Sequence, residues 1–113
     1  MVGIYFKEKR IVYCDGFWKE PINVERGVQV MRCLLRYVKD EVEDKKGVEL
    51  DMTGWKMDSL KNIPEQTDGH SCGVFSLMFA RYLAHSEAMN FSQTNMAFFR
   101  RRIAADVLRG WTE

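Results

Sequence analysis

Residues 63–73 read Ile-Pro-Glu-Gln-Thr-Asp-Gly-His-Ser-Cys-Gly, and they lead directly into the apolar run Val-Phe-Ser-Leu-Met-Phe at residues 74–79. Pro64 disfavours helical geometry in the residue before it, and the Asp-Gly pair at 68–69 is a turn signal. We therefore predict a helix that begins at Ser71 or Cys72 and continues through the apolar run. Cys72 thus stands at the point where a loop becomes a helix.

Two interpretations of Cys72 follow from its position. The first turn of a helix exposes unpaired backbone N–H groups and the positive end of the helix dipole, and both favour a thiolate over a thiol. Gln66, six residues earlier, carries amide N–H donors that could stabilise the oxyanion formed when a thiolate attacks a carbonyl. On the other interpretation Cys72 is a small buried hydrophobic residue, which is the common fate of an isolated cysteine. Taken alone, the position of Cys72 favours the buried residue over the nucleophile.

The whole string Pro-x-Gln-x-x-Gly-x-x-Cys-Gly, followed by an apolar helix, resembles the catalytic segment of the SUMO-specific (sentrin-specific) cysteine proteases, which cleave ubiquitin-like proteins. The matching residues are Pro64, Gln66, Gly69, Cys72 and Gly73. That family usually has glutamine, asparagine and aspartate where this chain has Glu65, Asp68 and Ser71. The resemblance implies that Cys72 is the nucleophile and Gln66 the oxyanion donor. Ser71 can still cap the helix through its hydroxyl.

The chain opens with two β-prone runs, Val2 to Phe6 and Ile11 to Cys14, separated by a polar loop of hairpin length. The second run ends at Asp15-Gly16, which by itself is typical of a turn. The resemblance implies another role for this aspartate, because the family has a strand ending in Tyr-x-Asp-Ser and Tyr13-x-Asp15 matches it. Asp15 would then orient the catalytic histidine. Cys14 and Cys33 are interpreted as packing residues.

Three further elements are expected. Apolar residues recur every three or four positions after Asn23, a good N-cap, and Gly47 should end this amphipathic helix. A short strand around residues 55–57 leads towards Pro64. A last helix should start after the polar residues 90–94 and end near Gly110, with the arginines at 100–102 forming a solvated face.

Neither histidine of the chain is a suitable general base for the Cys72 thiol. The chain has two histidines. His85 lies about 20 Å along the helix from Cys72, and His70 is interpreted as a solvent-facing loop residue. The family pattern places its catalytic histidine just before Met1. We considered a fragment of a longer protease, a short inactive protein and a protein completed by a partner, and we favour the fragment.

The composition narrows the function further. The net charge of +1 gives no electrostatic reason to expect binding to nucleic acid or to a membrane surface. Three irregularly spaced cysteines are typical of a reducing compartment, and no signal peptide or membrane-spanning run is evident, so we expect an intracellular protein of the nucleus or cytoplasm. The histidines and cysteines lack metal-ligand spacing, and no cofactor is expected.

These observations combine into one hypothesis. The fold class is α+β, with residues 1–113 forming the C-terminal portion of a papain-like catalytic domain in which a small antiparallel sheet packs on a central helix. By resemblance, the function is a cysteine peptidase or isopeptidase that cleaves SUMO or a related ubiquitin-like modifier after its C-terminal Gly-Gly. The alternative is a catalytically inactive module that binds a ubiquitin-like protein or has a structural role. A ubiquitin-like protein is the expected partner of the protease and of the binding module. A purely structural module would not require this partner.

Overall fold

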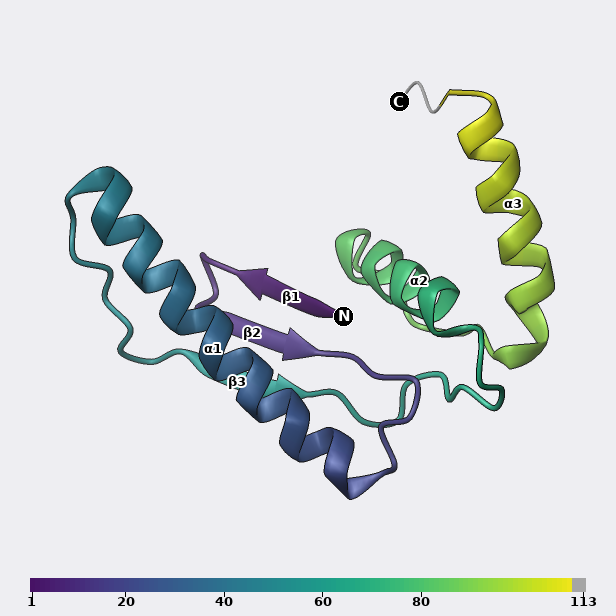
Figure 1. The fold of residues 1–113 in the computed structure, drawn as a ribbon, viewed down its shortest axis with the longest axis horizontal. Helices are drawn as coiled ribbons and strands as arrows, with labels where there is room; N and C mark the ends of the chain where they lie inside the picture. Colours follow the sequence, from purple (N-terminus) through teal and green to yellow (C-terminus); the bar gives the residue numbers. More distant parts are fainter. Residues whose placement is uncertain (111–113) are drawn as a thin grey trace.

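The computed structural model describes residues 1–110, which form three strands and three α-helices (Figure 1). In chain order they are β1 (Val2–Tyr5), β2 (Arg10–Tyr13), α1 (Pro21–Lys46), β3 (Lys56–Ser59), α2 (Cys72–Ala84), the 3-10 turn η1 (Gln93–Asn95) and α3 (Met96–Leu108). The α+β class is confirmed.

The sheet has the order β1-β2-β3 and is mixed. β1 and β2 form the expected antiparallel hairpin, with Val2 opposite Tyr13 and Tyr5 opposite Arg10. β3, however, runs parallel to β2, with Ile11 opposite Met57. The expectation of a wholly antiparallel sheet was wrong, because α1 lies between β2 and β3 and a helical crossover of this kind joins parallel strands.

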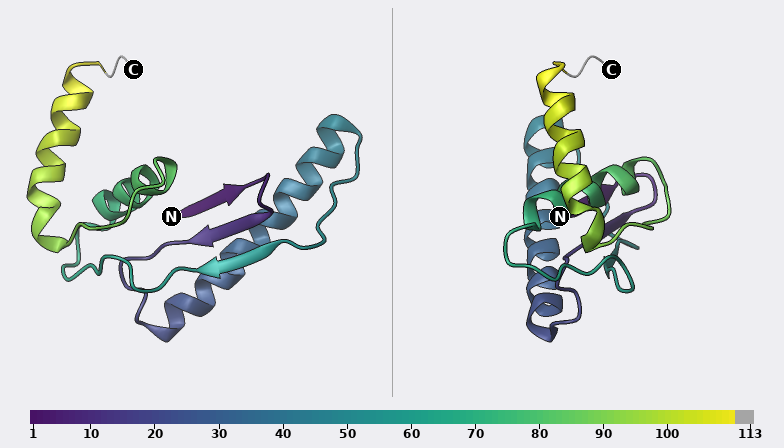
Figure 2. Two further views of the ribbon diagram at one scale, coloured as in Figure 1. Left: turned by 180° about the vertical axis from the view of Figure 1, so that it is seen from behind. Right: turned by 90° about the vertical axis from the view of Figure 1, so that its right-hand side faces the viewer.

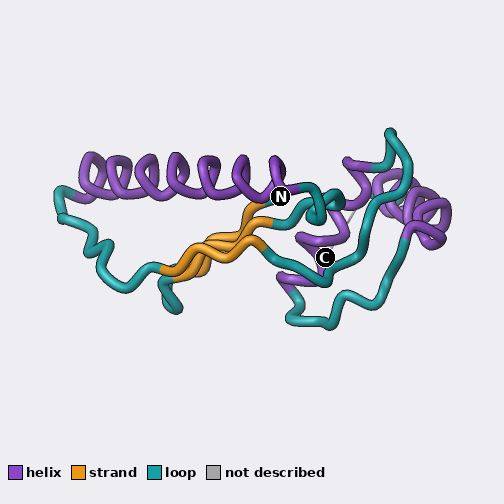
Figure 3. Tube along the Cα trace, turned by 90° about the horizontal axis from the view of Figure 1, so that it is seen from below, coloured by secondary structure: helices purple, strands orange, loops and turns teal. Residues whose placement is uncertain are grey.

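α1 covers one face of the sheet, as Figure 3 shows. Its apolar stripe is the predicted one, and Met31 and Leu35 meet Ile11 in a core beneath the helix. The helix starts at Pro21 rather than at Asn23, because proline is well suited to the first helical position, where its missing N–H costs nothing. Gly47 ends it in the left-handed conformation with φ 63°, as expected.

A second core lies between α2, the segment before α3 and the end of the hairpin. Phe75, Met78 and Phe79 of α2 meet Phe91, Met96 and Cys14 there. α2 is buried on this face only, since Leu77 on its other side is 57% exposed. Within residues 1–110, α2 therefore contacts the sheet only at the edge strand β1. The helix that packs on β2 and β3 is α1.

The two cores give an open, flat shape with extents of 45 × 39 × 22 Å, and α3 extends away from the sheet (Figures 1 and 2). The radius of gyration is 16.2 Å, against roughly 13 Å expected for a compact domain of this length. Two long loops, residues 14–20 and 60–71, leave the same end of the neighbouring strands β2 and β3. They bring together the residues that the sequence singles out.

Candidate active site

Cys72 is the first residue of α2, as predicted. Ser71 before it is the N-cap, with φ −96° and ψ 11°, and Cys72 itself is exposed. The interpretation of Cys72 as a small buried hydrophobic residue is therefore wrong. Because the first N–H groups of a helix have no acceptor within it, the Cys72 backbone N–H is available beside the sulfur.

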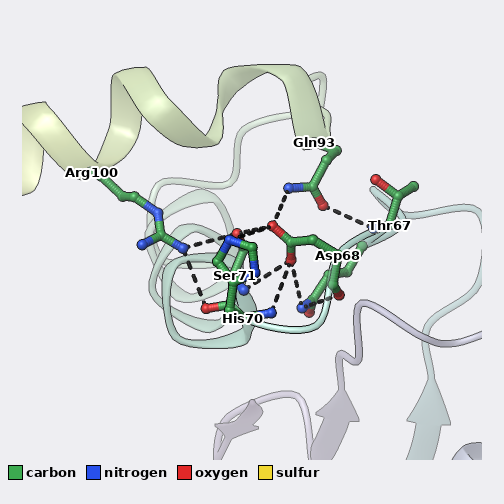
Figure 4. Close-up of polar contacts among 7 residues, drawn as sticks. Thr67, Asp68, His70, Ser71, Gln93 and Arg100 are labelled. Carbon is green, nitrogen blue, oxygen red and sulfur yellow. Dashed lines mark hydrogen bonds and ion pairs between the residues drawn. The ribbon is translucent and has the colours of Figure 1, made fainter.

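Asp68 organises the turn in front of Cys72. Its Oδ1 accepts the backbone N–H groups of Ser71 at 2.9 Å and of His70 at 3.3 Å, and its Oδ2 accepts the Ser71 hydroxyl at 2.5 Å (Figure 4). The Ser71 hydroxyl bond is the largest cause that holds the pKa of Asp68 well below its usual range. Ser71 makes no side-chain cap to the helix, contrary to expectation, and its hydroxyl donates to this carboxylate instead.

Gln66 is held inside the same loop and is only 3% exposed. Its Nε2 donates to the Asp68 carbonyl at 3.0 Å and to Asp68 Oδ1 at 3.2 Å. Its backbone N–H donates to the Gly16 carbonyl at 2.8 Å. The amide is thus near the turn that leads to Cys72, but its donors face Asp68, and its role as oxyanion donor stays a prediction.

Asp15 forms the turn that its sequence context indicates. Its Oδ1 accepts the Phe17 backbone N–H at 2.9 Å, and the Tyr13 hydroxyl donates to Oδ2 at 3.4 Å. Burial, followed by the charge and hydrogen bond of Asp15, raises the pKa of Tyr13. The Tyr13 ring lies against Gly27 of α1, where a Cβ would come within 2.5 Å of the ring. The carboxylate is fixed in place, while its role towards a histidine stays a prediction.

The two loops are joined directly. Gly16 is buried against Gln66, and a Cβ at Gly16 would lie 2.7 Å from Gln66 Cβ. The Trp18 indole Nε1 donates to the Ile63 carbonyl at 2.9 Å, and Lys19 pairs with Glu65 at 2.8 Å. The structure therefore brings the Asp15 loop and the Gln66 loop side by side.

The histidines do not complete this arrangement. The His70 side chain is 77% exposed, as a loop histidine was expected to be, and its Nε2 lies 3.5 Å from Asp68 Oδ2. His85 caps the C-terminal end of α2, at the opposite end from Cys72. Neither one connects Cys72 with Asp15 in the contacts of residues 1–110.

Two residues of this site come from far along the chain and were not predicted. Gln93 donates from Nε2 to Asp68 Oδ2 at 3.0 Å and accepts the Thr67 N–H at 2.8 Å. Arg100 of α3 donates to Ser71 Oγ at 3.0 Å and to the His70 carbonyl at 3.3 Å. The arginine run was interpreted as a solvated face, and Arg100 is exposed as expected, but its contacts with Ser71 and His70 were not predicted. Nothing in the local sequence of either residue indicates these partners.

The family is decided by the sequence match to a known domain. Residues 1–109 match the model of the Ulp1 protease family, C-terminal catalytic domain. The chain belongs to the Ulp1 protease family. The relatives are ubiquitin-like-specific and sentrin-specific proteases, so the family expected from the Cys72 segment is confirmed.

Individual relatives match over nearly the whole chain. The ubiquitin-like-specific protease ESD4 of Arabidopsis thaliana is 30% identical over 105 residues, which are 91% of this chain and 20% of that protein. The human sentrin-specific protease 2 is 28% identical over 110 residues, which are 96% of this chain and 18% of that protein. The chain thus spans about a fifth of the length of these curated Ulp1-family relatives.

A solved structure shares the fold. The C-terminal Ulp1 protease domain in complex with Smt3, the yeast ortholog of SUMO, superposes with a TM-score of 0.76 and 24% sequence identity. The match covers 96% of this chain and 45% of that one. The expected papain-like architecture of the Ulp1 catalytic domain is therefore confirmed for this part.

The other cysteines differ from Cys72 and from each other. Cys14 is buried in the second core, and burial raises the pKa of its thiol to about 11. Cys14 is a packing residue, as expected. Cys33 is exposed on α1, so its interpretation as a packing residue is wrong. Position 33 falls outside the apolar stripe that faces the sheet.

Two further findings concern other kinds of site. Residues 1–110 contain no group of three or more metal-ligating side chains close enough to hold an ion. None of the helices in that range combines the length and the apolar character that a bilayer crossing requires.

Proposed function

We propose that this chain is the C-terminal portion of a cysteine peptidase or isopeptidase domain that cleaves SUMO or a related ubiquitin-like modifier after its C-terminal Gly-Gly. One observation carries the proposal. An exposed cysteine begins α2, and the preceding loop, which holds Gln66, is hydrogen-bonded to the loop of Asp15. Membership of the Ulp1 family and the names of the relatives, ubiquitin-like-specific and sentrin-specific proteases, support the substrate class.

The proposed roles follow from the chemistry of acyl transfer. Cys72 Sγ attacks the carbonyl carbon of the terminal glycine as its proton passes to a general base, and the carbonyl oxygen becomes an oxyanion. Collapse of this intermediate breaks the bond to the leaving amine, which takes the proton from the base, and water then hydrolyses the thioester. The Cys72 backbone N–H and the Gln66 amide donate to the oxyanion. Both contacts of the Gln66 amide are now with Asp68, so one of its N–H groups must turn from Asp68 towards the substrate.

A histidine from outside residues 1–113 is proposed as the general base. Met1 and Cys14 exchange backbone hydrogen bonds of 2.8 and 2.9 Å, which continue the β1-β2 ladder beyond Val2 and Tyr13. The same register puts the position before Met1 opposite Asp15. A histidine at this edge would have the Asp15 carboxylate beside it, which suits the fixing of its tautomer and the stabilisation of its charged form.

Covalent capture tests the nucleophile. The probe is SUMO carrying a C-terminal vinyl methyl ester, and the adduct is detected by intact mass. We expect an adduct with the wild-type chain and with Cys33→Ser, and none with Cys72→Ser. Binding of SUMO without an adduct, both by this chain and by the same chain extended with a histidine before Met1, would instead favour the inactive binding module.

A second experiment tests the general base. The chain is extended by a histidine directly before Met1, and a matched chain carries alanine there. Release of a fluorophore from the SUMO C-terminus should be faster with histidine by at least about a hundredfold, the usual contribution of general acid–base catalysis. Equal rates would contradict the assignment of the base to this edge, without affecting the assignment of Cys72.

A further inference from the structure

The side-chain amide of Gln93 uses both of its ends on the loop before Cys72. Its Oε1 accepts the Thr67 backbone N–H at 2.8 Å, and its Nε2 donates to Asp68 Oδ2 at 3.0 Å (Figure 4). Both partners belong to the two residues that follow Gln66, although Gln93 is 26 and 25 positions away from them in the sequence. One amide therefore holds this loop through an acceptor and a donor at the same time.

The Gln66 backbone is fixed by the peptide groups on either side of it. Its own N–H, which belongs to the peptide group before it, donates to the Gly16 carbonyl at 2.8 Å. The Thr67 N–H belongs to the peptide group after it and donates to Gln93. Because each peptide group is planar, these two bonds set the direction in which the Gln66 side chain leaves the backbone. Gly16 and Gln93 thus hold Gln66 from opposite sides.

The position of Gln93 is itself set by buried neighbours. Phe91, two residues earlier, is 6% exposed, and Met96, three residues later, is 3% exposed. Both lie in the second core with Phe75 and Phe79 of α2. Between them Gln93 begins η1, where the Asn95 side chain accepts the Ser92 N–H at 2.9 Å. The Gln93 amide therefore extends from a backbone that is anchored in the core.

We propose that Gln93 is a positioning residue for Gln66, the oxyanion donor of the proposed mechanism. The inference rests on the proposed function, in which one Gln66 N–H turns from Asp68 towards the substrate. When it turns, the Asp68 carboxylate keeps its donors from Ser71 and Gln93. The loop can therefore stay fixed while the Gln66 amide changes its partner.

The two ends of the Gln93 amide can be tested separately. In Gln93→Glu one carboxyl oxygen still accepts the Thr67 N–H, but the other replaces the Nε2 donor that lies 3.0 Å from Asp68 Oδ2. Repulsion between the two carboxylates raises the pKa of the introduced carboxyl group. Once that group is protonated, its O–H donates to Asp68 again. We expect Gln93→Glu to be impaired at neutral pH and to recover as the pH falls.

The comparison with wild type isolates the introduced group. Asp68 stays ionised in this range, because the Ser71 hydroxyl and its other donors hold the pKa of Asp68 well below its usual range. The remaining titratable or charged groups near this contact are the His70 imidazole, with Nε2 3.5 Å from Asp68 Oδ2, and the Arg100 guanidinium, which donates to Ser71 Oγ. Wild type and variant share both groups, so their titration cancels in the ratio of the two rates.

The test uses the chain extended by a histidine before Met1 and the release of a fluorophore from the SUMO C-terminus. Gln93→Ala should slow release by about tenfold, the effect of a lost charge-assisted hydrogen bond. In a chain that already carries Gln66→Ala, it should slow release by less than about threefold, because no donor is left to position. Gln29→Ala, at an exposed position of α1, is the matched control and should leave the rate unchanged.

Hydrogen exchange followed by NMR measures the same contact without any substrate. Gln93→Ala should lower the protection of the Thr67 amide by about tenfold, while the amides of α1 report that the fold is intact. In Gln93→Glu, both the release rate relative to wild type and the Thr67 protection should rise as the pH falls from neutral. In Gln93→Ala, which has no group to protonate, the relative rate should not change with pH.

Three results would overturn the inference. The first is Thr67 exchange in Gln93→Ala that equals that in Gln29→Ala. The second is an equal slowing by Gln93→Ala with and without Gln66, which would make Gln93 a merely structural residue. The third is a Gln93→Glu variant whose relative rate and Thr67 protection do not depend on pH. If the extended wild type releases no fluorophore, the proposed function fails, and the Thr67 exchange still supports or refutes the contact with Gln93.

Discussion

The backbone N–H of Gln66 donates a 2.8 Å hydrogen bond to the carbonyl of Gly16. This bond joins two loops that are fifty residues apart in sequence, one carrying Asp15 and the other leading to Cys72. Gly16 is buried with no room for a side chain, because a Cβ there would lie 2.7 Å from Gln66 Cβ. This contact explains how a small, open structure keeps the Asp15 loop and the Gln66 loop next to each other.

Gly16→Ala should therefore displace Gln66 and destabilise the fold by about 1–3 kcal/mol, which is the usual cost of overpacking a filled site. Chemical unfolding measures the change. Gly69→Ala is the matched control in the same region, since a Cβ at Gly69 meets nothing within 4 Å, and it should change stability by less than about 0.5 kcal/mol. Equal effects of the two substitutions would contradict the close contact.

The two loops are also held by Trp18, whose indole N–H donates to the Ile63 carbonyl at 2.9 Å. Trp18→Phe keeps an aromatic ring but removes this donor, so it should cost about 1 kcal/mol of unfolding free energy. Trp55→Phe is the control, because the buried Trp55 Nε1 has no hydrogen-bond partner among residues 1–110. It should be less destabilising than Trp18→Phe, and the reverse order would refute the role of the Trp18 bond.

Acid should remove the contribution of Asp68. Its pKa in the folded chain lies below the ordinary value of 3.8, so its contribution to stability is fully present above that value and is lost as the pH falls through the folded pKa. The charged or titratable groups facing it are the His70 imidazole and, across Ser71, the Arg100 guanidinium.

The difference in melting temperature between wild type and Asp68→Asn should accordingly be largest near neutral pH and should shrink below pH 3.8. Thermal unfolding followed by circular dichroism across this range measures it. A difference that grows as the solution becomes more acidic would have the wrong sign for a carboxylate stabilised in its ionised form.

The three cysteines should separate by reactivity. Cys14 is buried with a pKa of about 11, so only about one thiol in a thousand is ionised at pH 8. Ellman's reagent should therefore modify two thiols rapidly, Cys33 and Cys72, and the third only on unfolding. Cys33→Ser and Cys72→Ser should each leave one rapid thiol. Three equally rapid thiols in the wild type would show that the core around Cys14 opens readily.

Much of the architecture could be predicted because it follows from local patterns. The hairpin, the stripe of α1, its end at Gly47 and the start of α2 at Cys72 depend on neighbours within a few positions. The direction of β3 was missed because strand pairing is decided by the crossover and not by the strand's own residues. Cys33 was misjudged because a cysteine carries little information about burial unless its place in the helical period is counted.

The site was predictable only in part, for the same reason. Cys72, Gln66 and Asp15 were found through one local segment and one resemblance. Asp68 was recognised as a turn former but not as the acceptor for Gln93, and the hydrogen bonds of the exposed Arg100 were not predicted, because these partners come from distant parts of the chain. The Ser71 hydroxyl was expected to cap α2, and it instead donates to Asp68 while its oxygen accepts from Arg100.

The most direct measurement of the central claim is peptide mapping of the adduct formed with SUMO vinyl methyl ester, together with the release rates of wild type and Gln66→Ala. We predict that the modifier is attached at Cys72 alone, and that Gln66→Ala slows the release of a fluorophore from the SUMO C-terminus, measured in the chain extended by histidine, by about tenfold or more through loss of an oxyanion donor. Attachment at Cys33 to a similar extent, or a rate independent of Gln66, would contradict a site built from Cys72 and Gln66.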